Sequence, residues 1–258
     1  MVLNAKFRQL IRKFVIDECS EMLVLREELL CIKRDAVKQI LKLRDNSLNQ
    51  KELLLERFSA INYELSESIQ NLILNGQILP ALGLIRWQIV AWQRCFTLYH
   101  SPKLFYKWTR GKHLREIQCR RFISSYLRKG HGASRQDNEK LRLDDDRTDF
   151  HNLSAMFHFN QSWIKQMYNI CTMSVIDEFV KHSVRRAVFM EMRNTMRVVG
   201  VLLTHLREIS TGDYSCYNAL TLRYNSLDDK LQEMRESFRR LEDQLGLNRL
   251  SRSGGLPS

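Results

Sequence analysis

Hydrophobic residues recur every three or four positions over most of this chain, which is the spacing that places apolar side chains on one face of an α-helix. A first helix is predicted from about residue 4 to residue 44, and a second from about residue 50 to residue 74. Polar residues 45–49 indicate a turn between them, and Asn75-Gly76 indicates a helix stop, because glycine adopts the left-handed cap conformation easily. We expect the two helices to fold back on each other as a hairpin.

The next stretch, residues 86–129, combines helical spacing with many aromatic and basic side chains. Proline and glycine divide it, because proline ends helices and glycine interrupts them. The expected elements are a helix that starts after Pro80 and ends near residue 100, a stop at Ser101-Pro102, a short helix or turn over residues 103–108, a break at Gly111 and a helix over residues 112–128.

Residues 130–149 are polar, contain two glycines and the acidic run Asp144–Asp146, and are predicted to be a linker between two regions. Residues 1–129 then form an N-terminal helical region that includes segment 86–129. Residues 150–247 form a second region with two helices, and residues 248–258 form a flexible tail. The first helix of the second region is expected over residues 150–210, with Gly200 as a point where it could bend.

The last helix carries the most regular hydrophobic pattern in the chain. From Tyr217 onwards, apolar residues alternate at intervals of three and four over four heptads, which is typical of a coiled coil. The residues predicted to pair are Leu220, Tyr224, Leu227, Leu231, Met234, Phe238, Leu241 and Leu245. In a parallel homodimer Lys230 would meet Arg235, so the pattern favours antiparallel packing on the chain's own long helix, or pairing with a different subunit.

The elements together predict an all-α protein: an elongated bundle of long helices with a C-terminal coiled coil. Only Pro80 and Pro102 interrupt the body of the chain, so its helices are free to be long. A helix over residues 150–210 would extend for roughly 90 Å at about 1.5 Å per residue. Such a helix is longer than one compact core, which is why an elongated molecule is expected.

Charge distribution changes the picture of segment 86–129. This segment holds 11 Lys and Arg residues against one acid, Glu116, whereas the whole chain has a net charge of +12. The chain outside it is therefore nearly neutral, and the segment is predicted to bind an anionic partner. The candidate binding residues are Lys103, Lys107, Arg110, Lys112, Arg115, Arg120, Arg121, Arg128 and Lys129.

Three kinds of anionic partner suit this segment: an acidic protein surface, an anionic membrane and nucleic acid. The aromatic residues of its first half, Trp87, Trp92, Phe96 and Tyr99, are predicted to pack in the core, with the neighbouring basic residues on the wet face of the same helix. The second half, residues 103–129, is predicted to lie on the surface.

Catalytic and metal-binding motifs are missing from the sequence. It contains no phosphate-binding glycine loop, no nucleophile elbow and no zinc-protease motif. The six cysteines lie far apart without zinc spacing and are expected to be reduced thiols. We therefore predict no enzyme activity, no catalytic residue, no metal site and no cofactor.

We expect a non-enzymatic structural or adaptor subunit of a larger intracellular assembly, for example a cytoskeletal, microtubule-associated one. It would use coiled-coil pairing, in a hetero-oligomer rather than a homo-oligomer, and its basic segment would dock on an acidic partner. The N-terminus lacks the continuous apolar stretch of a secretory signal, so the cytoplasm or cytoskeleton is expected, with the nucleus as an alternative. The alternative functions are a peripheral membrane-binding helical protein and a nucleic-acid-binding protein.

Overall fold

The computed structural model describes residues 5–45, 47–128 and 178–244, and these residues form eight helices and no strand. The predicted all-α class is therefore confirmed for the described chain. The helices are α1 (Ala5–Glu18), α2 (Ser20–Leu43), α3 (Gln50–Leu74), α4 (Ile78–His100), α5 (Pro102–Thr109), α6 (Glu116–Arg128), α10 (Glu178–Ile209) and α11 (Ser215–Gln244).

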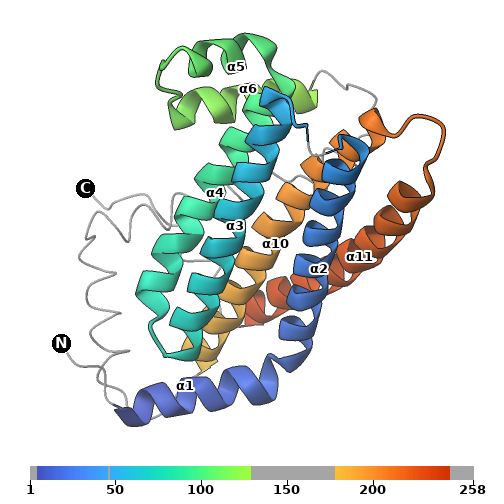
Figure 1. Ribbon diagram of the computed structural model, residues 1–258. Coiled ribbons are helices and arrows are strands. Elements are labelled where there is room, and N and C mark those ends of the chain that lie inside the picture. Colours follow the sequence, from blue (N-terminus) through green and yellow to red (C-terminus); the bar gives the residue numbers. More distant parts are fainter. Residues whose placement is uncertain (1–4, 46, 129–177, 245–258) are drawn as a thin grey trace.

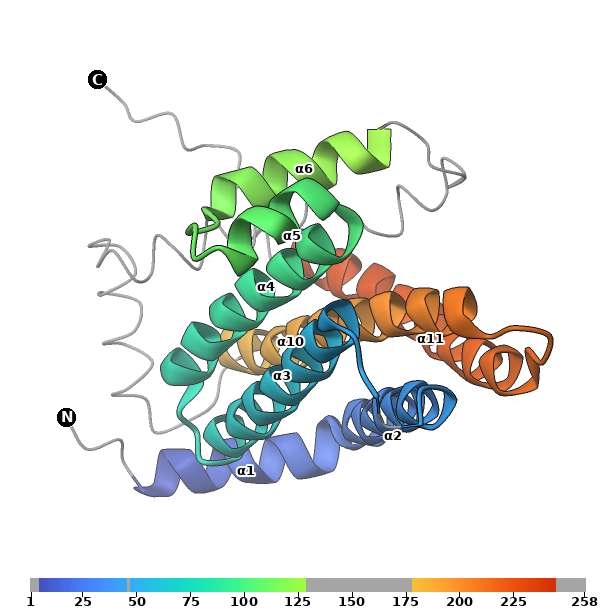
Figure 2. The same cartoon turned by 45° about the horizontal axis from the view of Figure 1, so that its top comes forward.

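Four helices, α2, α3, α4 and α10, lie side by side and form the body of the bundle (Figure 1). Helix α1 crosses one end of this body, and α5 and α6 cover the opposite end. Helix α11 folds back from α10 and runs across α10 and α2 (Figures 1 and 2). The apolar stripes meet in one core, in which Ile32, Ile69, Ile89 and Val199 are fully buried.

The turns of the first hairpin follow the predicted boundaries. Asn49 caps α3: its Oδ1 accepts hydrogen bonds from the backbone N–H groups of Lys51 and Glu52, and the Glu52 carboxylate accepts one from the Asn49 N–H. Gly76 ends the helix at a φ of +67°. A β-carbon at Gly76 would lie 3.2 Å from the Cα of Arg8, so α1 approaches this turn closely.

The predicted single helix over residues 4–44 is wrong, because it breaks at Cys19 into α1 and α2. Neither proline nor glycine marks the break. Helix α1 instead buries Phe7, Ile11 and Phe14 across the end of the bundle, whereas α2 packs along its side. One straight helix cannot cover both surfaces, so tertiary packing sets this boundary.

Helix α4 begins at Ile78, two residues before Pro80, which lies in the first turn where its missing N–H is not needed. Helix α10 runs through Gly200 without interruption and ends before Gly212, which adopts a φ of +89°. The predicted linker, residues 150–177 of the helix predicted over residues 150–210, Leu245 and the tail lie outside the described residues.

Candidate anionic-partner interface

Residues 102–128, which we call the basic arm, comprise α5, a connecting loop and α6 at one end of the bundle. A small core separate from the main one holds the arm in place. Leu114 and Cys119 of the arm are buried against Leu54 and Leu98, which belong to α3 and α4. The arm is therefore a fixed part of the surface that α3 and α4 support.

Helix α5 contributes no buried side chain to the protein. Its start is fixed locally, because the Ser101 hydroxyl accepts a hydrogen bond from the Leu104 N–H and Pro102 occupies the first helical position. Its end is followed by Gly111, at a φ of +75°. This helix is ordered by its caps and by half-buried Leu104 and Phe105, and most of its surface faces solvent.

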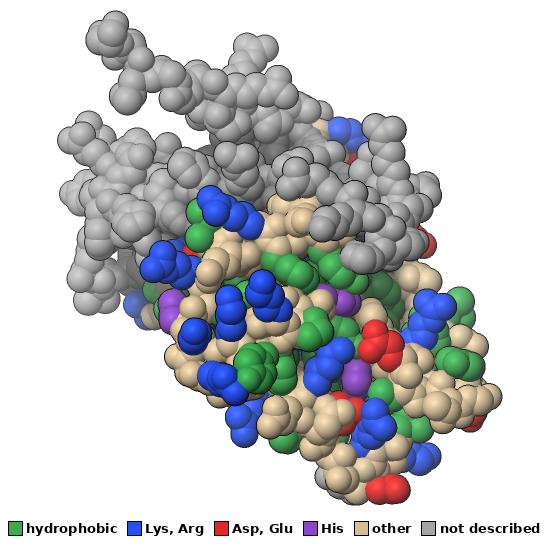
Figure 3. Space-filling view, turned by 90° about the horizontal axis from the view of Figure 1, so that it is seen from above, with side chains coloured by type: hydrophobic (Ala, Val, Ile, Leu, Met, Phe, Trp, Pro, Cys, Tyr) green, Lys and Arg blue, Asp and Glu red, His purple; other side chains and the backbone are tan. Residues whose placement is uncertain are grey.

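Six of the nine predicted binding residues are exposed on the arm, and in the described part of the chain none of the six forms an ion pair. Figure 3 looks down on this end of the molecule and shows Lys and Arg side chains spread over it with hydrophobic side chains between them. Arg120 is half-buried, and the side chain of Arg128 and the whole of Lys129 lie outside the described residues. The six exposed residues are Lys103, Lys107, Arg110, Lys112, Arg115 and Arg121.

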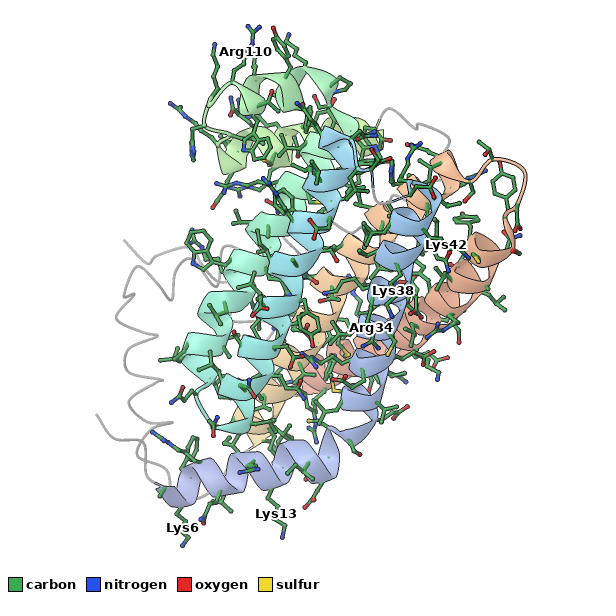
Figure 4. All side chains as sticks on the ribbon, viewed as in Figure 1. Lys6, Lys13, Arg34, Lys38, Lys42 and Arg110 are labelled. Carbon is green, nitrogen blue, oxygen red and sulfur yellow. The ribbon has the colours of Figure 1, made fainter. Side chains whose placement is uncertain are left out.

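Exposed aromatic side chains lie among these cations. Tyr106 is 54% exposed and Trp108 is 40% exposed, and the Arg110 guanidinium lies 4.1 Å from the centre of the Tyr106 ring. Figure 4 shows Arg110 at the far end of the arm, pointing away from the bundle. Aromatic rings beside guanidinium groups are favoured anchors at protein interfaces. The arm therefore offers both charge and apolar contact area.

The prediction that four aromatic residues pack in the core is correct for three of them. Trp92, Phe96 and Tyr99 are buried, and Trp92 packs edge to face on Phe96. Trp87 is 59% exposed, so the prediction that it packs in the core is wrong. Buried Ile85, Gln88 and Ile89 lie on one face of α4, and at 3.6 residues per turn Trp87 falls on the opposite face.

The predicted pairing stripe on α11 packs against α10 and α2 of the same chain. Leu220, Leu227 and Leu231 are buried, and the Phe238 ring lies 5.3 Å from the ring of Phe189 on α10. Tyr224, Met234 and Leu241 are partly exposed, and Leu245 lies outside the described residues. The side chains predicted for pairing are therefore already used, in large part, for intramolecular packing.

A buried polar layer crosses the middle of the bundle, and the sequence pattern did not reveal it. Arg26 Nε lies 3.3 Å from Glu191 Oε2, and both side chains are 2% exposed. The Glu191 carboxylate also accepts hydrogen bonds from the hydroxyls of Ser66 and Thr195, and Gln88 donates to both hydroxyl oxygens. About two helix turns further along α2, Lys33 donates to Asn62, and burial lowers the pKa of Lys33 to about 7.

A second polar layer lies closer to the basic arm. His205 Nε2 lies 3.2 Å from the carboxylate of buried Glu52, and the Tyr99 hydroxyl donates to Glu208. Burial lowers the pKa of His205, against the opposing effect of Glu52. Burial favours the neutral form of Glu52, but hydrogen bonds from Asn49, Arg44 and His205 outweigh it and lower the pKa of that carboxyl.

The cavity that borders the first polar layer is too small to hold a substrate. The cavity beside Arg26 and Glu191 has a volume of about 10 Å³, which is enough for about one water molecule. In the described ranges no group of three or more His, Cys, Asp or Glu residues could hold a metal ion. Within the same ranges, no helix has both the length and the apolar composition needed to cross a bilayer. The geometry of these layers suits structural hydrogen bonding.

A scan of protein-family models, a search of curated proteins and a search of solved structures each found no match to this chain.

Proposed function

We propose that this protein is a non-enzymatic adaptor or structural subunit that docks on an acidic protein surface through its basic arm. The observation that carries the proposal is the exposure of six basic side chains around α5, a helix without a fully buried side chain. Most of the surface of α5 faces solvent, so its exposed cations and aromatic rings are available for a partner. A microtubule or another acidic polymer is the type of partner that suits the arm.

We favour a protein surface as the partner, rather than a partner that is held by charge attraction alone, because the arm is pre-organised. The secondary core around Leu114 fixes α5 and α6 against the bundle, so binding does not have to order them. Arginine and tryptophan side chains at such a position also bury apolar area on a partner. Six cations that contact acidic groups would make the association rate fall with added salt.

The test compares two variants of the full chain that each lose three exposed cations. Lys107→Gln/Arg110→Gln/Lys112→Gln alters the arm, and Arg34→Gln/Lys38→Gln/Lys42→Gln is the matched control on α2, well away from Arg110 (Figure 4). Co-sedimentation with microtubules and affinity capture of acidic proteins are the measurements. We expect the wild type and the control to bind and the arm variant to lose at least tenfold in affinity.

Equal binding by the two variants would contradict the proposal.

Exposed Tyr106 and Trp108 beside lysine and arginine also suit the headgroup region of an anionic membrane, which is the second candidate function. Vesicles with and without acidic lipid distinguish the two candidates, since the membrane candidate requires acidic lipid. A generic DNA duplex in a salt titration tests nucleic-acid binding, where a flat response would argue against phosphate contacts.

The pairing part of the proposal concerns α11 and the predicted elongated assembly. We keep helix pairing with a different subunit as a prediction, with the C-terminal part of the stripe around Leu241 as its starting point. A compact chain of this length would have a radius of gyration of about 18 Å. Small-angle scattering and light scattering on the isolated chain test this part, because a monomer with that radius would contradict an elongated subunit.

A further inference from the structure

Helices α10 and α11 border a groove with a volume of about 410 Å³, on the surface of the bundle and distinct from the basic arm. This volume falls within the range of about 300 to 1,000 Å³ that is usual for small-molecule sites. Helix α11 folds back across α10 (Figure 2), and residues of these two helices line the groove. Its charged and hydroxyl-bearing lining includes Arg193, Arg197 and Arg207 of α10 and Tyr224, Asp228 and Arg235 of α11.

The two helices approach each other closely at Gly200 and Tyr224, which both line the groove. A β-carbon on Gly200 would lie 3.1 Å from the hydroxyl of Tyr224, so the absence of a side chain at Gly200 lets the Tyr224 ring reach α10. Arg193, Arg197 and Arg207 lie on the same face of α10 as Gly200, at helical spacing. Three arginines of α10, spread over roughly 21 Å of that helix, and one arginine of α11 therefore line the groove.

Positive charge dominates this lining. Four arginines line the groove with one acid, Asp228, among the described residues. Two of the arginines are nearly buried: Arg197 is 8% exposed and Arg235 is 7% exposed. A charge that lies in a partly dry hollow acts more strongly on a bound anion than a charge on open surface. A bound molecule that carries several negative charges would complement this lining.

Arg197 is held in a defined position. Its guanidinium lies 4.6 Å from the centre of the Trp92 ring and donates a hydrogen bond to the Asn194 side chain. A guanidinium fixed in this way is pre-organised to receive an oxyanion, and its planar array of N–H donors matches phosphate oxygens.

A second observation also points to a ligand. The Thr221 hydroxyl oxygen is buried in the wall of the groove and, among the described residues, has no hydrogen-bond partner. Buried hydroxyls nearly always have a partner in a folded protein. Part of the wall is apolar and includes Phe189, Met196 and Leu203, which would contact an organic body rather than a bare inorganic ion, and polar Asn225 and Gln232 also line the groove.

We propose that the groove between α10 and α11 binds a small organic molecule that carries phosphate groups. The arginines would contact the phosphate oxygens, the Thr221 hydroxyl would complete a hydrogen bond, and the apolar wall would contact the body of the molecule. A soluble phosphorylated metabolite and the phosphorylated headgroup of a lipid share this chemistry. The site is independent of the basic arm and of the proposed docking function.

Calorimetric titration of the full chain with inositol hexakisphosphate, adenosine triphosphate and inorganic phosphate tests the proposal. We expect at least one organic phosphate to bind at least tenfold more tightly than inorganic phosphate. Vesicles that contain a phosphoinositide form a separate arm of the experiment. Binding to vesicles but not to the soluble compounds would assign the site to a lipid headgroup, and binding to the soluble compounds would assign it to a metabolite.

Variants assign any binding to the groove. Arg193→Gln/Arg207→Gln should weaken binding at least tenfold, whereas Lys230→Gln/Arg240→Gln, which removes two exposed cations of α11 outside the groove, should leave it within twofold. Thr221→Val keeps the charge and shape and should weaken binding severalfold. Thermal unfolding followed by circular dichroism checks that each variant is folded. Absence of binding by every probe at millimolar concentration, or equal loss in the two charge variants, would overturn the proposal.

Discussion

The buried ion pair between Arg26 and Glu191 can be tested by removing each partner alone and both together. The variants are Arg26→Met, Glu191→Leu and the double variant. Both side chains are 2% exposed in the wild type, so each single change leaves the other charge in the interior. An uncompensated buried charge costs about 3 to 5 kcal/mol, whereas apolar replacement of both partners is often neutral or stabilising.

The surrounding contacts predict which single change costs more. When Glu191 is removed, Arg26 still contacts the carboxylates of Glu27 and Glu67, at 2.6 and 3.0 Å, although both of these acids are partly exposed. When Arg26 is removed, Glu191 keeps the hydrogen bonds from the neutral hydroxyls of Ser66 and Thr195 and an attraction to Lys33, whose charged form is disfavoured by burial. We expect a loss of about 3 kcal/mol for Glu191→Leu and about 5 kcal/mol for Arg26→Met.

Urea unfolding, followed by far-UV circular dichroism and by tryptophan fluorescence, measures these changes. A typical domain is stable by about 5 to 15 kcal/mol, so either single change removes a large share of the total. The double variant should lie within about 2 kcal/mol of the wild type, which gives a coupling energy of at least about 3 kcal/mol. Single losses below about 1 kcal/mol, or a double loss equal to the sum of the single losses, would refute the reasoning.

Three further predictions concern titration and thiol reactivity. The pKa of Lys33 is lowered to about 7 in the fold, whereas an unfolded lysine titrates near 10.4. The unfolded state therefore binds more protons between these values, so unfolding free energy should rise from pH 7 to pH 9 by up to about 1.4 kcal/mol per unit, and Lys33→Met should abolish the rise. The pKa of His205 is lowered by burial, so its neutral form stabilises the fold and this stability should be lost as pH falls through about 6.5. A His205→Gln variant with an unchanged acid profile would contradict this origin. Among the described cysteines, exposed Cys216 should react first with a maleimide, and buried Cys95, whose pKa is raised to about 12 by burial, should react only after unfolding, as peptide mass spectrometry can show.

Local signals were sufficient to predict most helix boundaries. The turn before Gln50, the stop at Gly76 and the end of the long helix near residue 210 all depend on residues within a few positions of the boundary, and each was predicted correctly. The break at Cys19 was not predicted, because it depends on the end of the bundle that α1 covers. Sequence spacing alone does not show where a neighbouring helix ends.

The basic arm could be located from the sequence, because an excess of cations without acids is visible in the composition of one segment. Six of its predicted cations, from Lys103 to Arg121, are exposed at the surface, as we expected for this half of the segment. The groove could not be predicted, since Arg197 and Arg235 come from different helices and their convergence depends on how α11 crosses α10. The polar layers were missed for the same reason, since Ser66 and Glu191 are 125 residues apart.

The two polar layers also fix how α10 is aligned with α3. Ser66 contacts Glu191 and Glu52 contacts His205, so the same interval of 14 residues separates the polar positions on both helices, in opposite chain directions. At about 1.5 Å per residue the layers lie roughly 21 Å apart, which is close to four helical turns and keeps them on one face. A slip of α10 by one turn would separate both pairs at once and leave the Glu191 carboxylate in the apolar core, at a cost of about 3 to 5 kcal/mol. A hydrophobic stripe alone tolerates such a slip, because one leucine replaces another. The two polar contacts therefore favour this register of α3 and α10 over one that is shifted by a turn.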